Sequence, residues 1–286
     1  MSDLDPRLNL FRPDLADIRL KDTLLADRYV AGKRHWVTTP VLDLKLEPDD
    51  ASGIGTQALL GEDLDLFEER NGWCWVQLKE DGYVGYVRAD GIAKIGLEAT
   101  HRVSVPRTFV YSEADLRSPV VNACSMGSRL ALTGETTTRG ARYLDLAGGG
   151  AVVARHVELL AHHVSDYVDV AGQFVQTPYL WGGRSGFGID CSGLVQLSMA
   201  ACGRDVLRDT DMQERSIGQP VACKDDYSDL LRGDLVFWKG HVAIVESSND
   251  VLHASGHAMQ VVREPLSDAI ERIRPLYGLP TGVRRP

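Results

Sequence analysis

The residues 178–197, PYLWGGRSGFGIDCSGLVQL, place one cysteine between an aspartate and a serine, after several glycines and before an apolar helical pattern. Asp190 is a favourable helix N-cap, so Cys191 is expected in the first turn of the helix that follows. There the helix dipole and unsatisfied N–H groups favour an anion and lower the pKa of a thiol. The upstream glycines are expected to leave N–H groups facing a developing oxyanion. The pattern therefore predicts a cysteine nucleophile, although an isolated cysteine is more often a buried structural thiol.

A cysteine nucleophile needs a base, and two histidines follow at positions that could supply one. His241 opens the apolar run HVAIV, and His253 lies in the next run, VLHAS. If these runs pair as a hairpin, His241 can accept the proton of Cys191 while His253 holds the imidazole in the useful tautomer. A satisfied core histidine is the alternative for His253, and His257 is its competitor for the third position. The three residues could also bind zinc by their types, but this chemistry needs no metal, and we expect no cofactor.

The elements that must position these residues are helices followed by strands. Apolar residues recur at helical spacing from 164 to 175, and Pro178 ends that pattern. A second helix is expected to begin at Cys191 and to end near Gly203. The strand-type runs 234–238, 241–247, 251–255 and 259–265 come afterwards. Helices first and strands afterwards indicate an α+β domain, which we assign to residues 161–286.

The preceding residues are predicted to form two small β-barrels. The run WCWVQLKEDGYVGYVRADGI (73–92) is echoed by RYLDLAGGGAVVARHVELL (142–160), each with a strand, a glycine turn and a second strand. Two copies of a unit of about 60 residues fit this span. They look like bacterial SH3 domains, with proposed ranges 36–97 and 98–160. Residues 1–35 are predicted to form an N-terminal arm.

Composition limits the possible partners. The 286 residues carry a net charge of -9, which argues against a nucleic-acid partner. No segment has the apolar length of a membrane span, and no secretory signal is visible at the start, so a cytoplasmic protein is expected. The five cysteines are widely spaced without a C-x-x-C pair, which disfavours a disulfide framework. The oligomeric state is not fixed by the sequence, and a monomer is consistent with it.

Three segments resemble the signature blocks of a known family. PYLWGGRSGFGIDCSGLVQ, RGDLVFWKGHVAIV and VLHAS look like those of the NlpC family of papain-like cysteine peptidases, which cleave bacterial cell-wall peptides. The resemblance implies Cys191 as nucleophile, His241 as base, His253 as the orienting residue and Tyr179 as part of the active-site lining. It also implies a papain-like α+β fold for this domain. With two SH3-like units in front, the chain is similar to the γ-D-glutamyl-L-diamino-acid endopeptidase (dipeptidyl-peptidase VI) branch.

That branch implies a murein-derived peptide as substrate. The peptide begins with a free L-Ala, followed by γ-D-Glu and a diamino acid, either diaminopimelate or lysine, and cleavage after γ-D-Glu releases L-Ala-γ-D-Glu. By resemblance, Glu62, Tyr83 and Asp190 bind the free ammonium, with Ser192 beside them. Carboxylates left unpaired by an N-acylated peptide would carry a large energetic cost, which selects the free amine. Two nearby aspartates, 63 and 65, leave the assignment of Glu62 open.

A further segment, LRDTDMQ (207–213), resembles the family's Arg-Asp-Ser substrate loop. It implies substrate contacts for Arg208, Asp209 and Thr210, where threonine replaces serine and keeps the hydroxyl. Arg208 could pair with the α-carboxylate of D-Glu, or it could form a structural ion pair with Asp209. Both interpretations fit the sequence.

Two other functions are weighed against this one. Related papain-like domains act as amidases or acyltransferases on other acyl substrates. Such enzymes are expected to have an apolar entrance that faces the membrane, and the sequence shows no amphipathic basic helix that could form one. A non-catalytic cell-wall-binding protein is the second alternative, and it predicts loss of a cysteine or histidine that this chain retains. With no signal peptide visible, we expect recycling of imported wall peptides.

Overall fold

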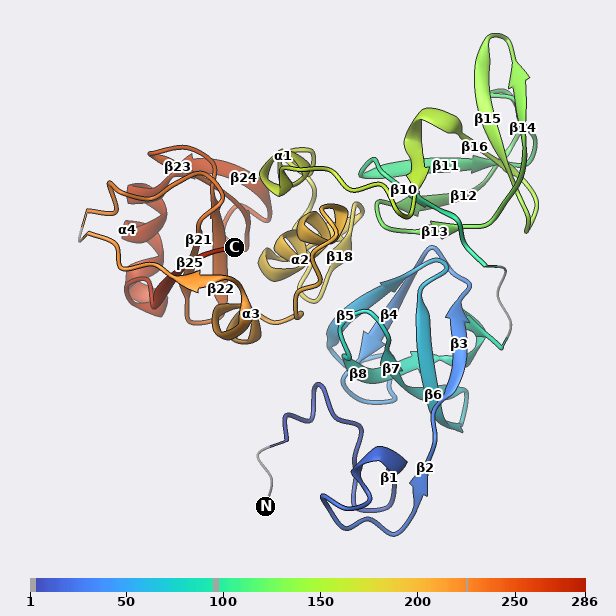
Figure 1. Cartoon of the computed structure of the whole chain (residues 1–286), viewed down its shortest axis with the longest axis horizontal. Helices are drawn as coiled ribbons and strands as arrows, with labels where there is room; N and C mark the ends of the chain where they lie inside the picture. The colour runs from blue at the N-terminus through green and yellow to red at the C-terminus, as the bar shows by residue number, and fades with distance from the viewer. Residues whose placement is uncertain (1–3, 95–97, 225) are drawn as a thin grey trace. The chain divides into compact units, whose positions relative to one another are not determined.

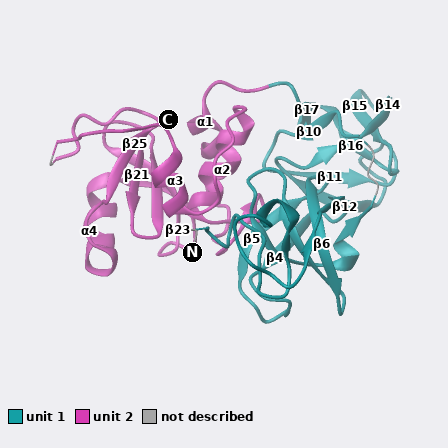
Figure 2. Ribbon diagram, turned by 60° about the horizontal axis from the view of Figure 1, so that its bottom comes forward, with its two compact units in different colours: residues 1–162 teal, residues 163–286 magenta. Residues whose placement is uncertain are grey.

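The computed structural model describes residues 4–94, 98–224 and 226–286, and the chain divides into two compact units, residues 1–162 and 163–286 (Figure 2). We call them unit 1 and unit 2 and describe each by itself. Unit 1 is built from strands, and unit 2 combines helices with one main sheet (Figure 1). Within the described residues, none of the helices is both long enough and apolar enough to cross a bilayer.

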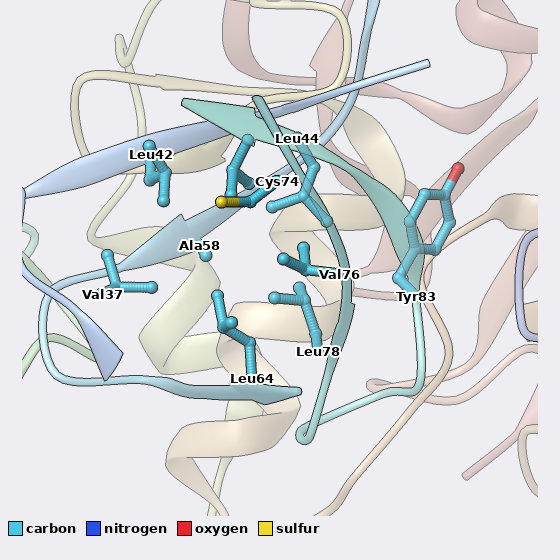
Figure 3. Packing of buried hydrophobic residues seen from close by; sticks show 10 residues of the cluster. Val37, Leu42, Leu44, Ala58, Leu64, Cys74, Val76, Leu78 and Tyr83 are labelled. Carbon is cyan, nitrogen blue, oxygen red and sulfur yellow. The ribbon is translucent and has the colours of Figure 1, made fainter. Parts of the chain in front are cut away.

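The first half of unit 1 is a seven-stranded antiparallel sheet with the strand order β5-β4-β8-β7-β6-β3-β9. Its strands are β3 (Lys33–Val37), β4 (Val41–Lys45), β5 (Ile54–Leu59), β6 (Asp63–Arg70), β7 (Trp73–Leu78), β8 (Val84–Arg88) and β9 (Ile92–Ala93). The sheet curls around a core that includes Leu44, Leu64 and Val76, all fully buried (Figure 3). Because β5 and β9 end the ladder, the predicted first barrel is open rather than closed.

The second half of unit 1 repeats this plan around a smaller core. A five-stranded sheet has the order β12-β11-β16-β15-β14, and a three-stranded one has the order β13-β10-β17. The strands are β10 (His101–Val103), β11 (Arg107–Tyr111), β12 (Val120–Ser125), β13 (Arg129–Leu130), β14 (Leu132–Thr138), β15 (Ala141–Leu146), β16 (Ala151–Val153) and β17 (Val157–Leu159). The hairpins β7–β8 and β15–β16 are the two segments whose sequences echo each other. Each is followed by a 3-10 helix, η2 (Ala89–Gly91) or η3 (Ala154–His156).

The N-terminal segment packs on the first sheet. It holds β1 (Ala16–Asp17), the 3-10 helix η1 (Ile18–Leu20) and β2 (Tyr29–Val30), and β1 pairs with β2 in parallel. Leu10 and Leu15 are buried in one cluster with Trp75 of β7. The guanidinium of Arg12 lies 4.1 Å from the centre of the Trp75 ring. The predicted arm is therefore folded against unit 1 through apolar and cation–π contacts.

Unit 2 is built on a six-stranded sheet with the order β20-β25-β21-β22-β23-β24. The four strand-type runs of the sequence form its centre and one edge. These strands are β20 (Gln219–Pro220), β21 (Leu235–Trp238), β22 (His241–Val245), β23 (Asp250–Ser255), β24 (Gln260–Pro265) and β25 (Gly282–Arg285). All the pairings in this sheet are antiparallel.

The described residues of unit 2 also form four α-helices and a short two-stranded ribbon. They are α1 (Tyr167–Gly172), α2 (Cys191–Ala201), α3 (Thr210–Ser216), α4 (Leu266–Tyr277), and the ribbon of β18 (Arg184–Ser185) and β19 (Gly188–Ile189). Helix α2 is buried from its first residue to Met199 and packs on β22 and β23. Leu266, Ala269 and Ile273 of α4 share a core cluster with residues of the sheet. The helical spacing predicted up to residue 175 is only partly realised, because α1 ends at Gly172 and turns carry the chain to Pro178.

Candidate active site

The candidate nucleophile lies at the start of α2. Asp190 has an extended backbone, and its carboxylate accepts a hydrogen bond of 2.7 Å from the Gly193 N–H, which makes it the N-cap. Cys191 is the first residue of the helix, and only 5% of its surface is exposed. The backbone N–H of Val242 donates a hydrogen bond to its thiol. Because Val242 follows His241 in β22, the sulfur lies beside the start of the strand that carries the candidate base.

The glycine loop before α2 packs directly against the helix start. A methyl group on Gly193 would lie 2.4 Å from the carbonyl oxygen of Gly183, which is closer than real atoms approach. The N–H of Gly182 donates to Asp190 at 2.9 Å, and the N–H of Gly183 donates to Leu180 at 2.9 Å. For these two glycines, the expectation of N–H groups that face an oxyanion is wrong, because the protein uses both groups internally. Because glycine has no side chain, the loop can pack closely against the start of α2.

Asp190 forms a buried ion pair with Arg208. The two guanidinium nitrogens of Arg208 donate to the two carboxylate oxygens at 3.0 and 2.8 Å, and further bonds reach Ser192 Oγ at 2.8 Å and the Gly183 carbonyl at 3.1 Å. Arg208 is 1% exposed, so this bidentate pair is shielded from water. The sequence left Arg208 between a substrate carboxylate and Asp209. The structure gives it a partner that was not considered, the helix N-cap itself.

The remaining residues of the 207–213 segment begin α3. Asp209 occupies the N-cap position and Thr210 is the first helical residue. Gln213, one turn later, donates from its amide to the Ser192 carbonyl at 3.0 Å and to the Leu207 carbonyl at 2.9 Å. Through the side-chain amide of Gln213, this segment therefore holds the first turn of α2 in place.

Burial dominates the protonation of Cys191. It raises the pKa of the thiol to about 12, and the charge of Asp190 acts in the same direction. The N–H groups of Val242 and Ser192 and the guanidinium of Arg208 lower the pKa by smaller amounts. The pKa is thus raised, whereas the helix start alone suggested a lowered one. The thiol is neutral in this structure, so it needs a base at the moment of attack.

The two histidines of the sequence analysis meet as expected for a hairpin of β22 and β23. His241 Nε2 lies 2.7 Å from His253 Nδ1, and the ring centres are 4.9 Å apart. Burial lowers the pKa of His241 well below its usual value, and the positive charge of Arg272 acts in the same direction. His241 is therefore a neutral imidazole at pH 7. With Nε2 bonded to His253, its Nδ1 is the nitrogen left to accept a proton.

The chain of hydrogen bonds extends to residues that sequence analysis missed. His253 Nε2 lies 2.7 Å from Oε1 of Glu264 on β24, and the same oxygen accepts a hydrogen bond from Arg272 on α4. His257, the competitor for the third position, lies exposed in the turn between β23 and β24. Recognising Glu264 required the register of β23 against β24, in which it pairs with Val251, two residues before His253.

Tyr179 lies close to the nucleophile. Burial raises the pKa of its phenol, and its electrostatic interactions with Asp190 and with the ionised form of Cys191 act in the same direction, so the ring lies near both residues. Its backbone forms a parallel bridge with Ile189, directly before the N-cap. The phenol is therefore protonated and available as a hydrogen-bond donor at the site.

Glu62 and Tyr83, the predicted ammonium ligands, lie in unit 1. Glu62 is buried next to the start of β6, and its carboxylate accepts a hydrogen bond of 2.9 Å from the Leu59 N–H. Tyr83 lies in the core of the first sheet, with its hydroxyl directed outward from the cluster (Figure 3). Asp63 and Asp65, the alternatives to Glu62, pair with Arg34 and Lys79 respectively. Any role of these residues toward the substrate remains a prediction.

Comparisons with family models divide the chain in the same way as its fold. Residues 176–273 match a model described as the NlpC/P60 family. Residues 46–92 match one described as the bacterial dipeptidyl-peptidase SH3 domain. The first match contains the candidate nucleophile and both histidines, as well as Glu264 and Arg272.

Relatives of similar length carry peptidase names. A protein of Lysinibacillus sphaericus named dipeptidyl-peptidase 6 is 28% identical over 264 residues, which cover 84% of this chain and 93% of the relative. A gamma-D-glutamyl-L-lysine dipeptidyl-peptidase of Bacillus cereus is 26% identical over 260 residues, or 81% of this chain and 76% of the relative.

Solved structures agree on the fold. An NlpC/P60 family protein from Bacillus cereus has a TM-score of 0.72 at 21% identity and covers 88% of this chain and 99% of its own. An NlpC/P60 endopeptidase from Photobacterium damselae has a TM-score of 0.60 at 15% identity, covering 93% and 74%. At these identities the likeness concerns the fold alone.

Proposed function

We propose that this chain, in which residues 176–273 belong to the NlpC/P60 family and residues 46–92 form a bacterial dipeptidyl-peptidase SH3 domain, is a cysteine peptidase of murein stem peptides. It hydrolyses the bond between γ-D-Glu and the diamino acid and releases L-Ala-γ-D-Glu. Relatives named dipeptidyl-peptidase 6 and gamma-D-glutamyl-L-lysine dipeptidyl-peptidase support this specificity. The chemistry depends on one observation. The buried thiol of Cys191 lies at the start of α2 and accepts a hydrogen bond from the N–H of Val242, the residue after His241. His241 is in turn hydrogen-bonded to His253.

The residues support a two-step acyl transfer. As the peptide binds, the Cys191 proton passes to His241, and the thiolate attacks the γ-carbonyl of D-Glu. The imidazolium then donates that proton to the leaving amine of the diamino acid, which leaves a thioester on Cys191. His241 next takes a proton from water, the hydroxide attacks the thioester, and the returned proton restores the thiol. His253 accepts the hydrogen bond from His241 Nε2 throughout and keeps the ring oriented.

A direct test uses the peptides L-Ala-γ-D-Glu-L-Lys and L-Ala-γ-D-Glu-diaminopimelate, with products separated by chromatography and identified by mass. We expect release of L-Ala-γ-D-Glu from at least one of them, and loss of cleavage in Cys191→Ala. Cys202→Ala, at the end of the same helix, is the matched control and should retain activity. Cleavage that survives Cys191→Ala would exclude this cysteine as the nucleophile.

The free-amine requirement is the second part of the proposal. From the resemblance stated above, Glu62, Tyr83, Asp190 and Ser192 are proposed as the ligands of the ammonium of L-Ala. Arg208 is proposed as the counter-ion that positions Asp190, because its guanidinium already spans both carboxylate oxygens. Asp209 and Thr210 are proposed to line the substrate loop, together with Tyr179.

An N-acetylated peptide tests this requirement. We expect it to be cleaved at least about 100-fold more slowly than the free peptide, because a buried carboxylate would lose its charged partner. Tyr83→Phe should narrow that difference while leaving the unfolding midpoint near that of the parent. Equal cleavage of both peptides by the parent protein would remove the ammonium site from the proposal.

The requirement also favours recycling over wall remodelling. In intact murein the L-Ala nitrogen is acylated, so an enzyme selective for the free amine would act on released peptides. We therefore propose that the protein acts in the cytoplasm on imported fragments. Cell fractionation tests the compartment, and recovery of the native protein outside the inner membrane would contradict it.

A further inference from the structure

We propose that Glu264 is a positioning residue that fixes the tautomers of both histidines, and that Arg272 holds its carboxylate in place. The inference rests on the proposed function to the extent that His241 must serve as a base. Its structural part, which nitrogen carries which proton, depends on this hydrogen-bond chain alone.

The chain is continuous from β22 to α4. It links His241 Nε2 to His253 Nδ1 at 2.7 Å, and His253 Nε2 to Glu264 Oε1 at 2.7 Å. Glu264 pairs with Val251 across β23 and β24, so it shares a sheet face with His253 two residues along that strand. Arg272, in the α-helix that follows β24, donates to the same Oε1.

An ionised carboxylate removes the ambiguity of a histidine pair. Two neutral imidazoles joined by one hydrogen bond can exchange donor and acceptor, since each ring has one N–H and one lone pair. Glu264 can only accept, so His253 must carry its proton on Nε2 and present the Nδ1 lone pair. His241 must then donate from Nε2, which leaves its Nδ1 unprotonated. Only this arrangement leaves His241 able to accept the proton of Cys191.

The surroundings keep Glu264 ionised. Partial burial on its own would raise the pKa of Glu264, but the hydrogen bond from His253 and the hydrogen bond and charge of Arg272 lower it below the usual value. The side chain of Glu264 is 20% exposed and that of His253 is 1% exposed. The carboxylate is therefore ionised and can only accept hydrogen bonds, and its bond to His253 is partly shielded from water.

The first measurement needs no substrate. Nitrogen-15 NMR of the imidazoles, assigned with single His→Gln variants, reports which ring nitrogens bear protons. In the parent protein at neutral pH, we expect His241 and His253 both in the Nε2–H form. A dominant Nδ1–H form of either ring would overturn the proposal, whether or not the protein cleaves any peptide.

The second measurement is the activity of Glu264 variants. Glu264→Ala should lower kcat by about 10- to 100-fold with KM changed less than about twofold, because it frees the tautomers without touching the substrate. Glu264→Gln keeps an acceptor oxygen and should recover part of that loss. Glu246→Gln, which breaks the ion pair between Glu246, directly after β22, and Arg263 of β24, is the matched control and should retain full activity.

The outcomes separate this proposal from the proposed function. Unchanged kcat and unchanged imidazole spectra in Glu264→Ala would overturn the role of Glu264 even in an active peptidase. A parent protein that cleaves no murein peptide but shows the expected tautomers would instead contradict the proposed function. If Glu264→Ala fails to fold, the spectrum of the parent protein still decides the protonation pattern.

Discussion

The thiol of Cys191 is the residue on which the chemistry depends, and its buried state sets how it reacts. With a pKa of about 12, it is almost fully protonated at neutral pH. We expect the rate of Cys191 alkylation by iodoacetamide to rise about tenfold per pH unit between pH 7 and 10, because only the thiolate reacts. Peptide mapping by mass spectrometry measures the rate at this site. A plateau near pH 7 would indicate a preformed thiolate–imidazolium pair.

The buried pair of Asp190 and Arg208 stabilises the site. In Arg208→Met the carboxylate of Asp190 stays buried without its counter-ion, so we expect a loss of about 3–5 kcal/mol in the free energy of unfolding. Urea titration followed by tryptophan fluorescence measures it. Arg263→Met, at a pair with Glu246 in which the arginine side chain is about half exposed, should cost no more than about 1 kcal/mol. Similar losses in the two variants would contradict a special role for the buried pair.

The neutral state of His241 links stability to pH. Its pKa is lowered in the folded protein, so below about pH 6.5 the unfolded chain binds a proton that the folded chain does not. The free energy of unfolding should therefore fall as pH decreases from 6.5 toward the folded pKa, by at most about 1.4 kcal/mol per pH unit, and should not depend on His241 above pH 7. His241→Asn should flatten this slope in urea titrations. A slope that persists unchanged would contradict the assignment, and His257→Asn, at an exposed turn, is the control.

At the scale of elements, the start of α2 depends on contact between two glycines. In Gly193→Ala the new methyl group would lie 2.4 Å from the Gly183 carbonyl oxygen, a backbone atom, and 3.0 Å from the Asp190 carboxylate. The loop or the helix must shift, so we expect a loss of about 1–3 kcal/mol and weaker Cys191 reactivity. Gly148→Ala is the matched control, because nothing lies within 4 Å of its added methyl group. Equal thermal midpoints for the two variants would show that the glycine contact is unimportant.

Local signals in the sequence were sufficient to predict several elements. Asp190 caps α2 because its own carboxylate reaches Gly193, three residues away, and the hairpin of β22 and β23 follows from its apolar runs. Side-chain pairs between residues far apart in the sequence could not be predicted in this way. Arg208 meets Asp190 across 18 positions, and Glu264 meets His253 only through the register of two strands. The expectation that the Gly182 N–H faces an oxyanion failed for the same reason, since this group donates to Asp190 across the loop.

At the scale of the whole molecule, each unit has hydrophobic cores of its own. The core around Leu44, Leu64 and Val76 belongs to unit 1, and the cluster joining α4 to the sheet belongs to unit 2. Such cores allow the two units to unfold as separate cooperative transitions. The nucleophile and its base lie in unit 2, and two of the four proposed ammonium ligands, Glu62 and Tyr83, lie in unit 1.

This division predicts that a destabilising substitution in one unit lowers the unfolding midpoint of that unit alone. Scanning calorimetry of the full chain should resolve two transitions, and Gly193→Ala should lower the midpoint of only one of them. A 1–3 kcal/mol loss corresponds to a shift of roughly 4–12 °C for a unit of this size. Leu64→Ala, in the core of the first sheet, should lower the other midpoint instead, because it leaves a cavity among fully buried side chains. If both variants lower the same single transition, the two units fold as one cooperative block, and the effects of Tyr83→Phe on amine preference can no longer be assigned to unit 1 alone.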